Sequence, residues 1–297
     1  MVSINYHRAY DFGAEVSGSD TGDGTEFSTD SEGSVFAYSV AFGFSLPSRP
    51  QVSFGASVNW HTQGLCRDYA WKRNELATFE IGTLDEDTFV LYETYDSFRA
   101  YNFTFGLLWD AFEKEENLLT LGAVCHTPFK AKVDFEKTGS EFETERLEMD
   151  FPLSLGAGVN YRFSDALSAA FDVEWRDWSE YEIRNRDTGD RKTHSNEDTL
   201  AFRLGFERLW FRDLAGGSAF ALRGGVFYET RPAAGIVEPA PLHGLSLGVG
   251  WTLKERFSLD LAYQYRWGED EFDFGDTRYD YELQEHFVVG SVIVYLR

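Results

Sequence analysis

Hydrophobic residues recur at every second position along segments of about ten residues, and each segment is followed by a turn. In residues 245–253, for example, Leu, Val and Trp alternate with Ser, Gly and Thr. A period of two is that of a β-strand, whose successive side chains point to opposite faces. One face of this strand is therefore bulky and apolar, and the other consists of glycines and hydroxyl groups. A soluble sheet would bury its bulky face, whereas a membrane barrel exposes that face to lipid.

Twelve such segments predict twelve strands. They span residues 2–6, 36–44, 52–60, 101–109, 119–125, 151–161, 167–175, 200–206, 220–228, 245–253, 257–265 and 287–295. The last segment is apolar on both faces, so its alternation does not tell which residues face outward. We expect the bulky residues of the other strands, Phe151 included, to point outward. The predicted fold is all-β: a single domain over residues 1–297, a transmembrane antiparallel up-and-down β-barrel.

The connections between these strands alternate in length. Short turns are expected near 47–50, 110–117, 164–166, 212–217 and 254–256, and long polar connections at 11–32, 62–97, 128–148, 183–198, 230–241 and 268–280. Outer-membrane barrels have short periplasmic turns and longer extracellular loops. This alternation therefore places both chain ends on the periplasmic side, which requires an even number of strands.

Trp and Tyr positions agree with this orientation. The residues expected near the extracellular rim are Trp60, Trp175, Tyr263 and Tyr265, and those near the periplasmic rim are Trp109, Tyr161, Trp210, Trp251 and Tyr295. Amphipathic rings gather at both interfaces of a bilayer, so two girdles are expected for a barrel. The competing architecture is a pair of soluble β-sandwiches, which would need a Pro- or Gly-rich linker between domains. The sequence shows no such linker.

Composition changes this picture little. Mean hydropathy is −0.36, and no apolar run approaches the length of a membrane helix, but barrel strands are apolar only at alternate positions. We expect Cys66 in a loop and Cys125 on a lipid-facing strand position, and therefore no disulfide between them. The net charge of −23 disfavours nucleic acid as a partner. The acidic residues of 11–32 are expected to form a solvated loop rather than a metal site.

Signatures of catalysis are missing from the sequence. The six histidines are scattered, without a pair at metal-ligand spacing, and no nucleophile elbow, zinc-protease helix or phosphate-binding loop is found. A barrel phospholipase would need a Ser–His pair on its outer wall, oriented by a third polar group. The sequence shows no such set. We therefore predict that the protein is not an enzyme and has no catalytic residues, metal or cofactor.

The predicted lumen face carries charged residues of both signs. The acidic ones are Asp172, Glu174, Glu207, Glu229 and Asp260, and the basic ones are Arg176, Arg203, Arg223 and Arg266. One interpretation is a cross-strand ionic network that keeps the wall rigid and the lumen wet. The other is that an arginine binds a ligand carboxylate through a bidentate contact. The four arginines are therefore candidate ligand-binding residues.

Several segments resemble the outer-membrane transporters of long-chain fatty acids and aromatic hydrocarbons (the FadL/TodX type). The most similar are 118–134, LLTLGAVCHTPFKAKVD, and 155–182, LGAGVNYRFSDALSAAFDVEWRDWSEYE; residues 219–232 and 281–297 are similar as well. The resemblance implies a barrel of fourteen strands with an N-terminal hatch in its lumen. Because Met1 leads directly into the first predicted strand, we expect the signal peptide, the hatch and two strands to be missing before it.

The resemblance also implies a function. The expected activity is outer-membrane transport of hydrophobic compounds, fatty acids or aromatic hydrocarbons, by non-covalent capture at extracellular loops and passage through the barrel. The alternatives are a structural or adhesive barrel with acidic surface loops and a general aqueous porin-like channel. The expected location is the bacterial outer membrane. Expected partners are a hydrophobic small-molecule ligand, outer-membrane lipid, lipopolysaccharide and the barrel assembly machinery.

Overall fold

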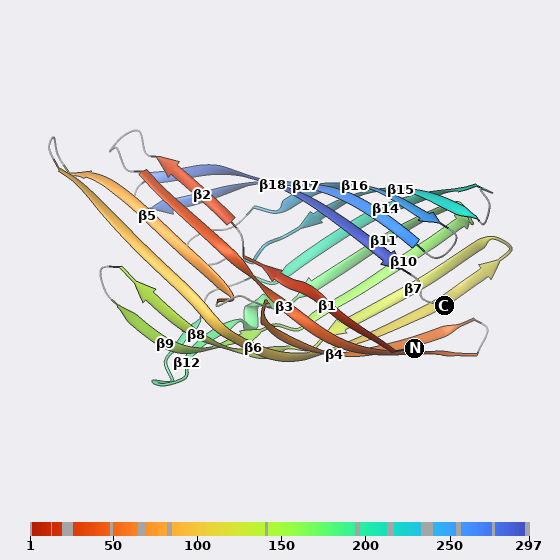
Figure 1. Cartoon of the computed structure of the whole chain (residues 1–297), viewed down its shortest axis with the longest axis horizontal. Coiled ribbons are helices and arrows are strands. Elements are labelled where there is room, and N and C mark those ends of the chain that lie inside the picture. Colours follow the sequence, from red (N-terminus) through yellow and green to blue (C-terminus); the bar gives the residue numbers. More distant parts are fainter. Residues whose placement is uncertain are drawn as a thin grey trace.

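Antiparallel β-strands make up nearly all of the protein (Figure 1). The computed structural model describes residues 2–12, 14–19, 26–47, 50–64, 69–81, 85–139, 142–193, 197–212, 217–232, 240–253, 257–274 and 277–294. The predicted positions of Cys66 and Tyr295 lie outside these residues. In the part of the chain that the structure describes, no helix has the length and apolar character required to cross a membrane.

Twelve strands form one continuous antiparallel series, which we call the wall. They are β1 (Val2–Asp11), β3 (Glu26–Leu46), β4 (Val52–Gln63), β6 (Asp85–Lys114), β7 (Asn117–His126), β10 (Ser154–Ser164), β11 (Leu167–Arg176), β14 (Thr199–Arg212), β15 (Ser218–Glu229), β16 (Leu242–Leu253), β17 (Phe257–Phe274) and β18 (Thr277–Val294). Each pairs with the next in this order. The predicted twelve-strand up-and-down barrel is confirmed.

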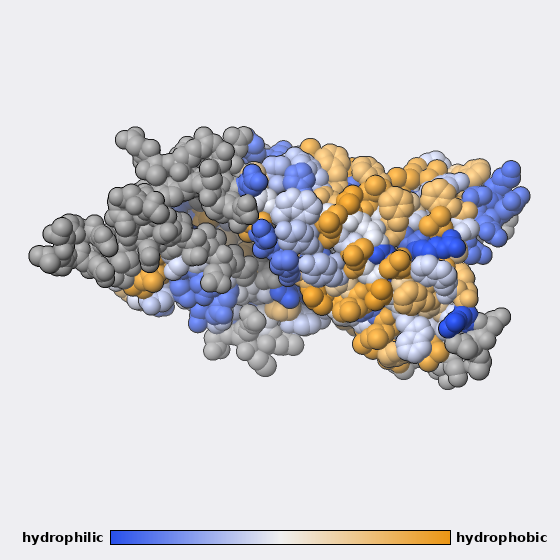
Figure 2. All heavy atoms as spheres, turned by 90° about the horizontal axis from the view of Figure 1, so that it is seen from above, coloured by the Kyte–Doolittle hydropathy of each residue, from blue (hydrophilic) through white to orange (hydrophobic). Residues whose placement is uncertain are grey.

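The bulky face of the wall points outward, as expected. In β16, Leu245, Leu247 and Val249 are 48%, 63% and 40% exposed, whereas Gly250 between β15 and β17 is buried. Figure 2 shows hydrophobic residues gathered over the half of the molecule that the wall strands form, with some polar residues among them. The outward face is therefore the lipid-facing one.

The register of β18 settles which of its residues face outward. Val288 lies opposite Tyr263 and Val292 opposite Leu259, and residues directly opposite each other in an antiparallel ladder share a face. Since Tyr263 and Leu259 are outward on β17, the even-numbered residues of β18 are outward as well. Val289 and Ile293 then face inward, and they are still 61% and 43% exposed.

The two ends of the barrel differ. β1 begins and β18 ends toward the end of the molecule where the short turns lie, and the long hairpins project at the other end (Figure 1). This arrangement agrees with chain ends on the periplasmic side and long connections outside the cell. Among the described residues, β1 has a ladder only with β3, and β18 only with β17.

Strands, rather than loops, form much of the projecting end, which we call the cap. Its elements are β2 (Ala14–Ser19), β5 (Trp71–Ile81), β8 (Phe129–Thr138), β9 (Glu143–Phe151), the 3₁₀ turn η1 (Trp178–Glu180), β12 (Glu182–Asn185) and β13 (Arg191–Thr193). They add to the outer parts of β3 and β6, because β2 and β5 pair with β3, and β5 and β8 pair with β6. β9 and β12 continue the sheet from β8. The prediction of plain polar connections at 62–97 and 128–148 was therefore wrong.

The protein's main hydrophobic core lies in the cap. Phe98, Ala131 and Val133 are no more than 1% exposed, and they pack with Phe129 and Phe151. The prediction that Phe151 points outward at the start of a wall strand was wrong. Phe151 is 8% exposed and is the last residue of β9. β9 ends there because Pro152 cannot continue the ladder, and the wall strand β10 begins only at residue 154.

A glycine marks the boundary between wall and cap on β3. Gly33 has φ +133°, and a Cβ there would lie 2.3 Å from the carbonyl oxygen of Ala70. The residues of β3 after Gly33 pair with β1 and β4, and those up to Gly33 pair with β2 and β5. Ser97, with φ 53°, lies at the matching register shift between β6 and β8. Only a residue without a side chain tolerates the crowding at position 33.

Candidate functional site

A row of glycines crosses the inner face of the wall. The registers place Gly43 opposite Gly55, Gly55 opposite Gly106, and Gly156 next to Val124 in the same row. A Cβ at Gly156 would lie 2.8 Å from Cγ1 of Val124, so this glycine makes room for the valine side chain. The backbone itself is therefore the lumen surface over much of β3 to β10.

These glycines bound a cavity of about 850 Å³, which we call the glycine chamber. Leu108 and Val124 contribute apolar side chains to it, and Asp172, Glu174 and Arg203 line its far side. The volume is within the range of small-molecule sites, and such sites are mostly apolar with a few polar groups. The chamber is thus suited in size and chemistry to a small hydrophobic molecule.

Two further cavities adjoin it. The polar chamber, about 930 Å³, shares His126 and Glu174 with the glycine chamber. The arginine chamber, about 740 Å³, shares Asp172 and Arg203 with it. The glycine chamber therefore lies between the other two cavities.

A hydrogen-bonded series of neutral side chains lines the polar chamber. Asn59 Nδ2 donates to Asn102 Oδ1 at 2.9 Å and lies 3.0 Å from Thr104 Oγ1. His61 Nε2 lies 3.0 Å from the same Asn102 oxygen, and Thr104 Oγ1 lies 3.0 Å from His126 Nδ1. All five side chains are inward on β4, β6 and β7. Sequence reasoning missed this series, although the inward parity of Asn59, Asn102 and Thr104 was readable from the strand pattern.

The four candidate arginines all lie in the lumen and are all paired. Arg203 Nη1 lies 3.2 Å from both Asp172 Oδ1 and Glu174 Oε2. Arg176 Nε is 2.9 Å from the other oxygen of Glu174, so the structure brings Arg176 and Arg203 together on one carboxylate. Ser154 Oγ also donates to Glu174, at 3.0 Å.

The other two arginines line the arginine chamber from β15 and β17, on either side of β16. Arg223 contacts Glu207 at 2.7 Å and Asp260 at 2.6 Å. Arg266 Nη2 lies 2.7 Å from Glu285 Oε2, a partner that sequence reasoning missed because the parity of β18 was ambiguous. The geometry supports the cross-strand ionic network, and the role of these arginines in ligand binding stays a prediction.

The cap closes the outer end of the polar chamber with aromatic rings. His61 stacks on Phe129 with ring centroids 5.0 Å apart, and Phe129 stacks on Phe151 at 4.7 Å. Tyr10 of β1 packs against Phe151 at 5.3 Å, and Trp178 also lines this end. Aromatic rings therefore cover the outer end of the polar series.

The raised pKa of Tyr181 also reflects the close packing of the cap. Burial raises the pKa of Tyr181 to about 12, since desolvation disfavours the charged phenolate. Its ring lies edge-on to Phe151, with centroids 6.1 Å apart. The inner face of the cap is therefore a packed core.

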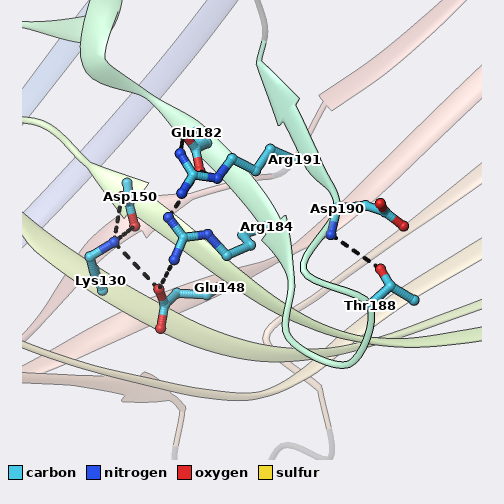
Figure 3. Close-up of polar contacts among 8 residues, drawn as sticks. All are labelled: Lys130, Glu148, Asp150, Glu182, Arg184, Thr188, Asp190 and Arg191. Carbon is cyan, nitrogen blue, oxygen red and sulfur yellow. Dashed lines mark hydrogen bonds and ion pairs between the residues drawn. The ribbon is translucent and has the colours of Figure 1, made fainter.

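The opposite face of the cap is covered by ion pairs (Figure 3). Lys130 of β8 contacts Asp150 at 2.6 Å and Glu148 at 3.4 Å on β9. Arg184 of β12 lies 3.2 Å from Glu182, which also pairs with Arg191 of β13. The hydrogen bond to Asp150 is the main cause that raises the pKa of Lys130. This charged face keeps the projecting sheet in water.

Among the described residues, no group of three or more His, Cys, Asp or Glu side chains could hold a metal ion.

On the outer wall, the Tyr263 hydroxyl lies 2.7 Å from His286 Nδ1. Tyr and His are amphipathic ring residues, and Tyr263 belongs to the extracellular girdle predicted above.

Comparison with known proteins places this architecture in a family. The model of the outer membrane protein transport protein family (OMPP1/FadL/TodX) matches residues 1–288. The chain belongs to this family. It is therefore a bacterial outer-membrane β-barrel, and the family transports hydrophobic compounds. No match is found among curated proteins.

Solved structures of the family share the fold at low sequence identity. The toluene transporter TodX of P. putida is 12% identical, with a TM-score of 0.54 over 100% of this chain and 78% of that one. A FadL homologue from Pseudomonas aeruginosa is 14% identical, with a TM-score of 0.52 over 98% and 86%. The CymD monoaromatic hydrocarbon channel is 15% identical, with a TM-score of 0.50 over 97% and 78%.

Proposed function

We propose that this family member takes up hydrophobic small molecules through its lumen, after capture at the cap. The observation that carries the proposal is the connection of the cavities. An aromatic outer end formed by Phe129, Phe151 and Trp178 leads into the polar chamber, which shares lining residues with the apolar glycine chamber. A path with these properties offers a hydrophobic molecule successive places outside water.

The driving force for capture is removal of apolar surface from water. Each Å² of buried apolar surface is worth about 25 cal/mol, so a molecule of benzene size gains a few kcal/mol on entering an apolar chamber. The site makes no covalent step necessary. Release follows because the chambers are adjoining and each binds weakly, which lets the molecule move on.

The glycine row gives a direct test. Gly106→Leu would place a bulky side chain in the glycine chamber, where a Cβ at this position has its nearest neighbour at 3.9 Å and therefore fits. We expect cells carrying this variant to take up labelled p-xylene about tenfold more slowly than cells with the unaltered protein, since the path is filled.

The matched control is Gly290→Leu. Gly290 is outward on β18, opposite Leu261, and nothing lies within 4 Å of a Cβ there. This variant should transport normally and show the same heat-modifiable migration in detergent gels. Equal uptake by Gly106→Leu and the unaltered protein would contradict transport through the glycine chamber.

A second candidate function, a general aqueous channel, is favoured by the charged lining of the arginine chamber. Arg203, Arg223 and Asp260 would hold water and ions there. Planar-bilayer recording separates the two functions. An aqueous channel gives a steady ion current, whereas the apolar glycine chamber should keep the conductance near the bilayer background.

A further inference from the structure

Two of the four arginines in the lumen are each shared by two carboxylates. Arg203 lies between Asp172 and Glu174, both at 3.2 Å. Arg223 lies between Glu207 at 2.7 Å and Asp260 at 2.6 Å. The triad of Glu207, Arg223 and Asp260 has a net charge of −1 when all its groups are ionised. The group around Arg203 also includes Arg176, which pairs with Glu174, and is neutral. The same residue types recur on neighbouring strands, because the registers place Asp172 opposite Arg203 and Glu207 opposite Arg223.

The chambers beside the triads hold more acid than base. Five carboxylates line the glycine and arginine chambers, against three guanidinium groups. The acids are Asp172, Glu174, Glu207, Glu229 and Asp260, and the bases are Arg203, Arg223 and Arg266. Arg176, which pairs with Glu174 from the polar chamber, offsets part of this excess. The negative charge that remains lies in the arginine chamber, where the low dielectric of the wall strengthens its repulsion of an anion.

The arginines that could bind a ligand carboxylate already pair with carboxylates of the protein. To bind Arg203 it would have to displace Asp172 or Glu174, and the displaced acid would stay nearby as a like charge. An ionised carboxylate without a partner is expensive to take out of water. An uncharged molecule meets neither cost, because it leaves both triads intact.

We propose that the lumen admits uncharged hydrophobic molecules and rejects carboxylates. The substrate class would then be neutral hydrocarbons and their uncharged derivatives, and ionised fatty acids would be excluded. This inference rests on the proposed function, since it specifies which hydrophobic molecules that function serves.

The position of the Arg203 triad makes the rejection effective. Glu174 lines both the polar and the glycine chambers, and Asp172 and Arg203 line both the glycine and the arginine chambers. A molecule that enters the glycine chamber from the polar one, or leaves it for the arginine chamber, therefore passes this triad. Selection by charge therefore occurs at both boundaries of the glycine chamber.

Two probes of the same shape test the proposal. Equilibrium dialysis of the full chain in detergent, with empty micelles as the blank, measures binding of labelled p-xylene and labelled p-toluate at neutral pH. We expect p-xylene to bind at least about tenfold more tightly, which corresponds to about 1.4 kcal/mol. Binding of p-toluate as tight as that of p-xylene would overturn the proposal.

Removal of one acid from the triad tests the cause. Glu174→Gln removes the acid that Arg176 and Arg203 share and leaves Asp172 paired with Arg203. p-Toluate should therefore gain affinity several-fold relative to p-xylene. The control is Asp187→Asn, which removes an acid paired with Arg146 on the cap, outside the lumen. An unchanged ratio in Glu174→Gln, in protein that still migrates as a folded barrel, would overturn the role of the triad.

Salt provides a readout that a purely structural effect would not move. Added salt screens charge repulsion, so the preference for p-xylene should narrow as ionic strength rises. A preference that is independent of salt would count against the charge mechanism. Absence of binding by either probe would instead contradict the proposed function itself, so the two failures are distinguishable.

Discussion

The wall and the cap use the same alternation of residues with opposite burial. In β16 of the wall the bulky residues are exposed, Leu247 to 63%, and glycines form the covered face. In β8 of the cap the bulky residues are buried, Val133 to 1% exposed, and charged residues such as Lys130 are exposed. The period of two therefore identifies a strand but does not show which of its two faces is buried.

The difference lies in the residues that alternate with the bulky ones. Wall strands place Gly, Ser and Thr between them, which leave room in a lumen. β8 places Lys130, Lys132, Asp134 and Glu136 between them, and four charges in a row need water. An opposite face of small residues, as in β16, indicates a membrane wall, and the unbroken charged face of β8 indicates a sheet that projects from it. Charges alone do not decide, because Asp172 and Arg203 lie on the lumen face of the wall.

The largest expected effect comes from Phe151, whose assignment distinguishes the two regions. Phe151→Ala should destabilise packing of the cap by about 3–5 kcal/mol, because it leaves a cavity in a closed core. Limited proteolysis of the purified protein should cut the 129–151 hairpin, while the barrel still shows heat-modifiable migration. The control is Leu155→Ala, whose side chain is 43% exposed on the lipid face. Equal sensitivity of the two variants would show that the cap has no core of its own.

A charge on the wall is expected to have the next largest effect. Leu247→Arg should cost about 2–4 kcal/mol if its outward position lies near the middle of the bilayer, because a charge there must leave water. The measurement is the urea midpoint for folding into lipid vesicles. Leu247→Phe, which keeps the position apolar, should fold normally. If the arginine variant kept the same midpoint, the exposed face of β16 would not be a lipid face.

A substitution at the boundary between wall and cap is expected to destabilise the protein less than these two. Gly33→Ala should destabilise the protein by about 1–3 kcal/mol, since alanine at φ +133° is strained and its Cβ would meet the backbone at Ala70. The same folding assay measures this, with Gly290→Ala as the control in open space. A neutral Gly33→Ala would mean that β3 passes from wall to cap without a bend at this residue.

The smallest effect concerns the charged face of the cap. The pKa of Lys130 is raised by its hydrogen bond to Asp150, so this pair stabilises the folded form below the unfolded value of about 10.5. The contribution is lost as pH rises through the folded-state pKa. Lys130 is 52% exposed, so screening limits the gain to about 0.3 kcal/mol or less. The measurement is the rate at which a protease cuts the cap, compared between the unaltered protein and Asp150→Asn. The two rates should differ slightly below the folded-state pKa of Lys130 and should be equal above it.

The wall was largely predictable from sequence, because lipid and lumen impose different residues on its two faces. All twelve strands, the outward position of residues such as Leu247, and the inward position of the four arginines follow from that contrast. The parity of β18 was not predictable, since its two faces are both apolar, and only its ladder with β17 determines it.

The cap and much of the candidate site were beyond sequence reasoning for another reason. The 128–148 segment is polar on average, so it resembles a loop until its two faces are read separately. Contacts such as His61 on Phe129 join segments far apart in the chain and depend on how the cap folds back. The cavities depend on registers, because a shift of one residue would turn the glycine row toward lipid.

The length of β6 has a mechanical consequence. At about 3.3 Å per residue, its 30 residues extend for about 100 Å, whereas about ten residues suffice to cross a bilayer. The same strand therefore serves as part of the wall at one end and as a beam under the cap at the other. A force applied to the cap along this strand loads the ladders beside it in shear, many hydrogen bonds at once, instead of peeling them one by one.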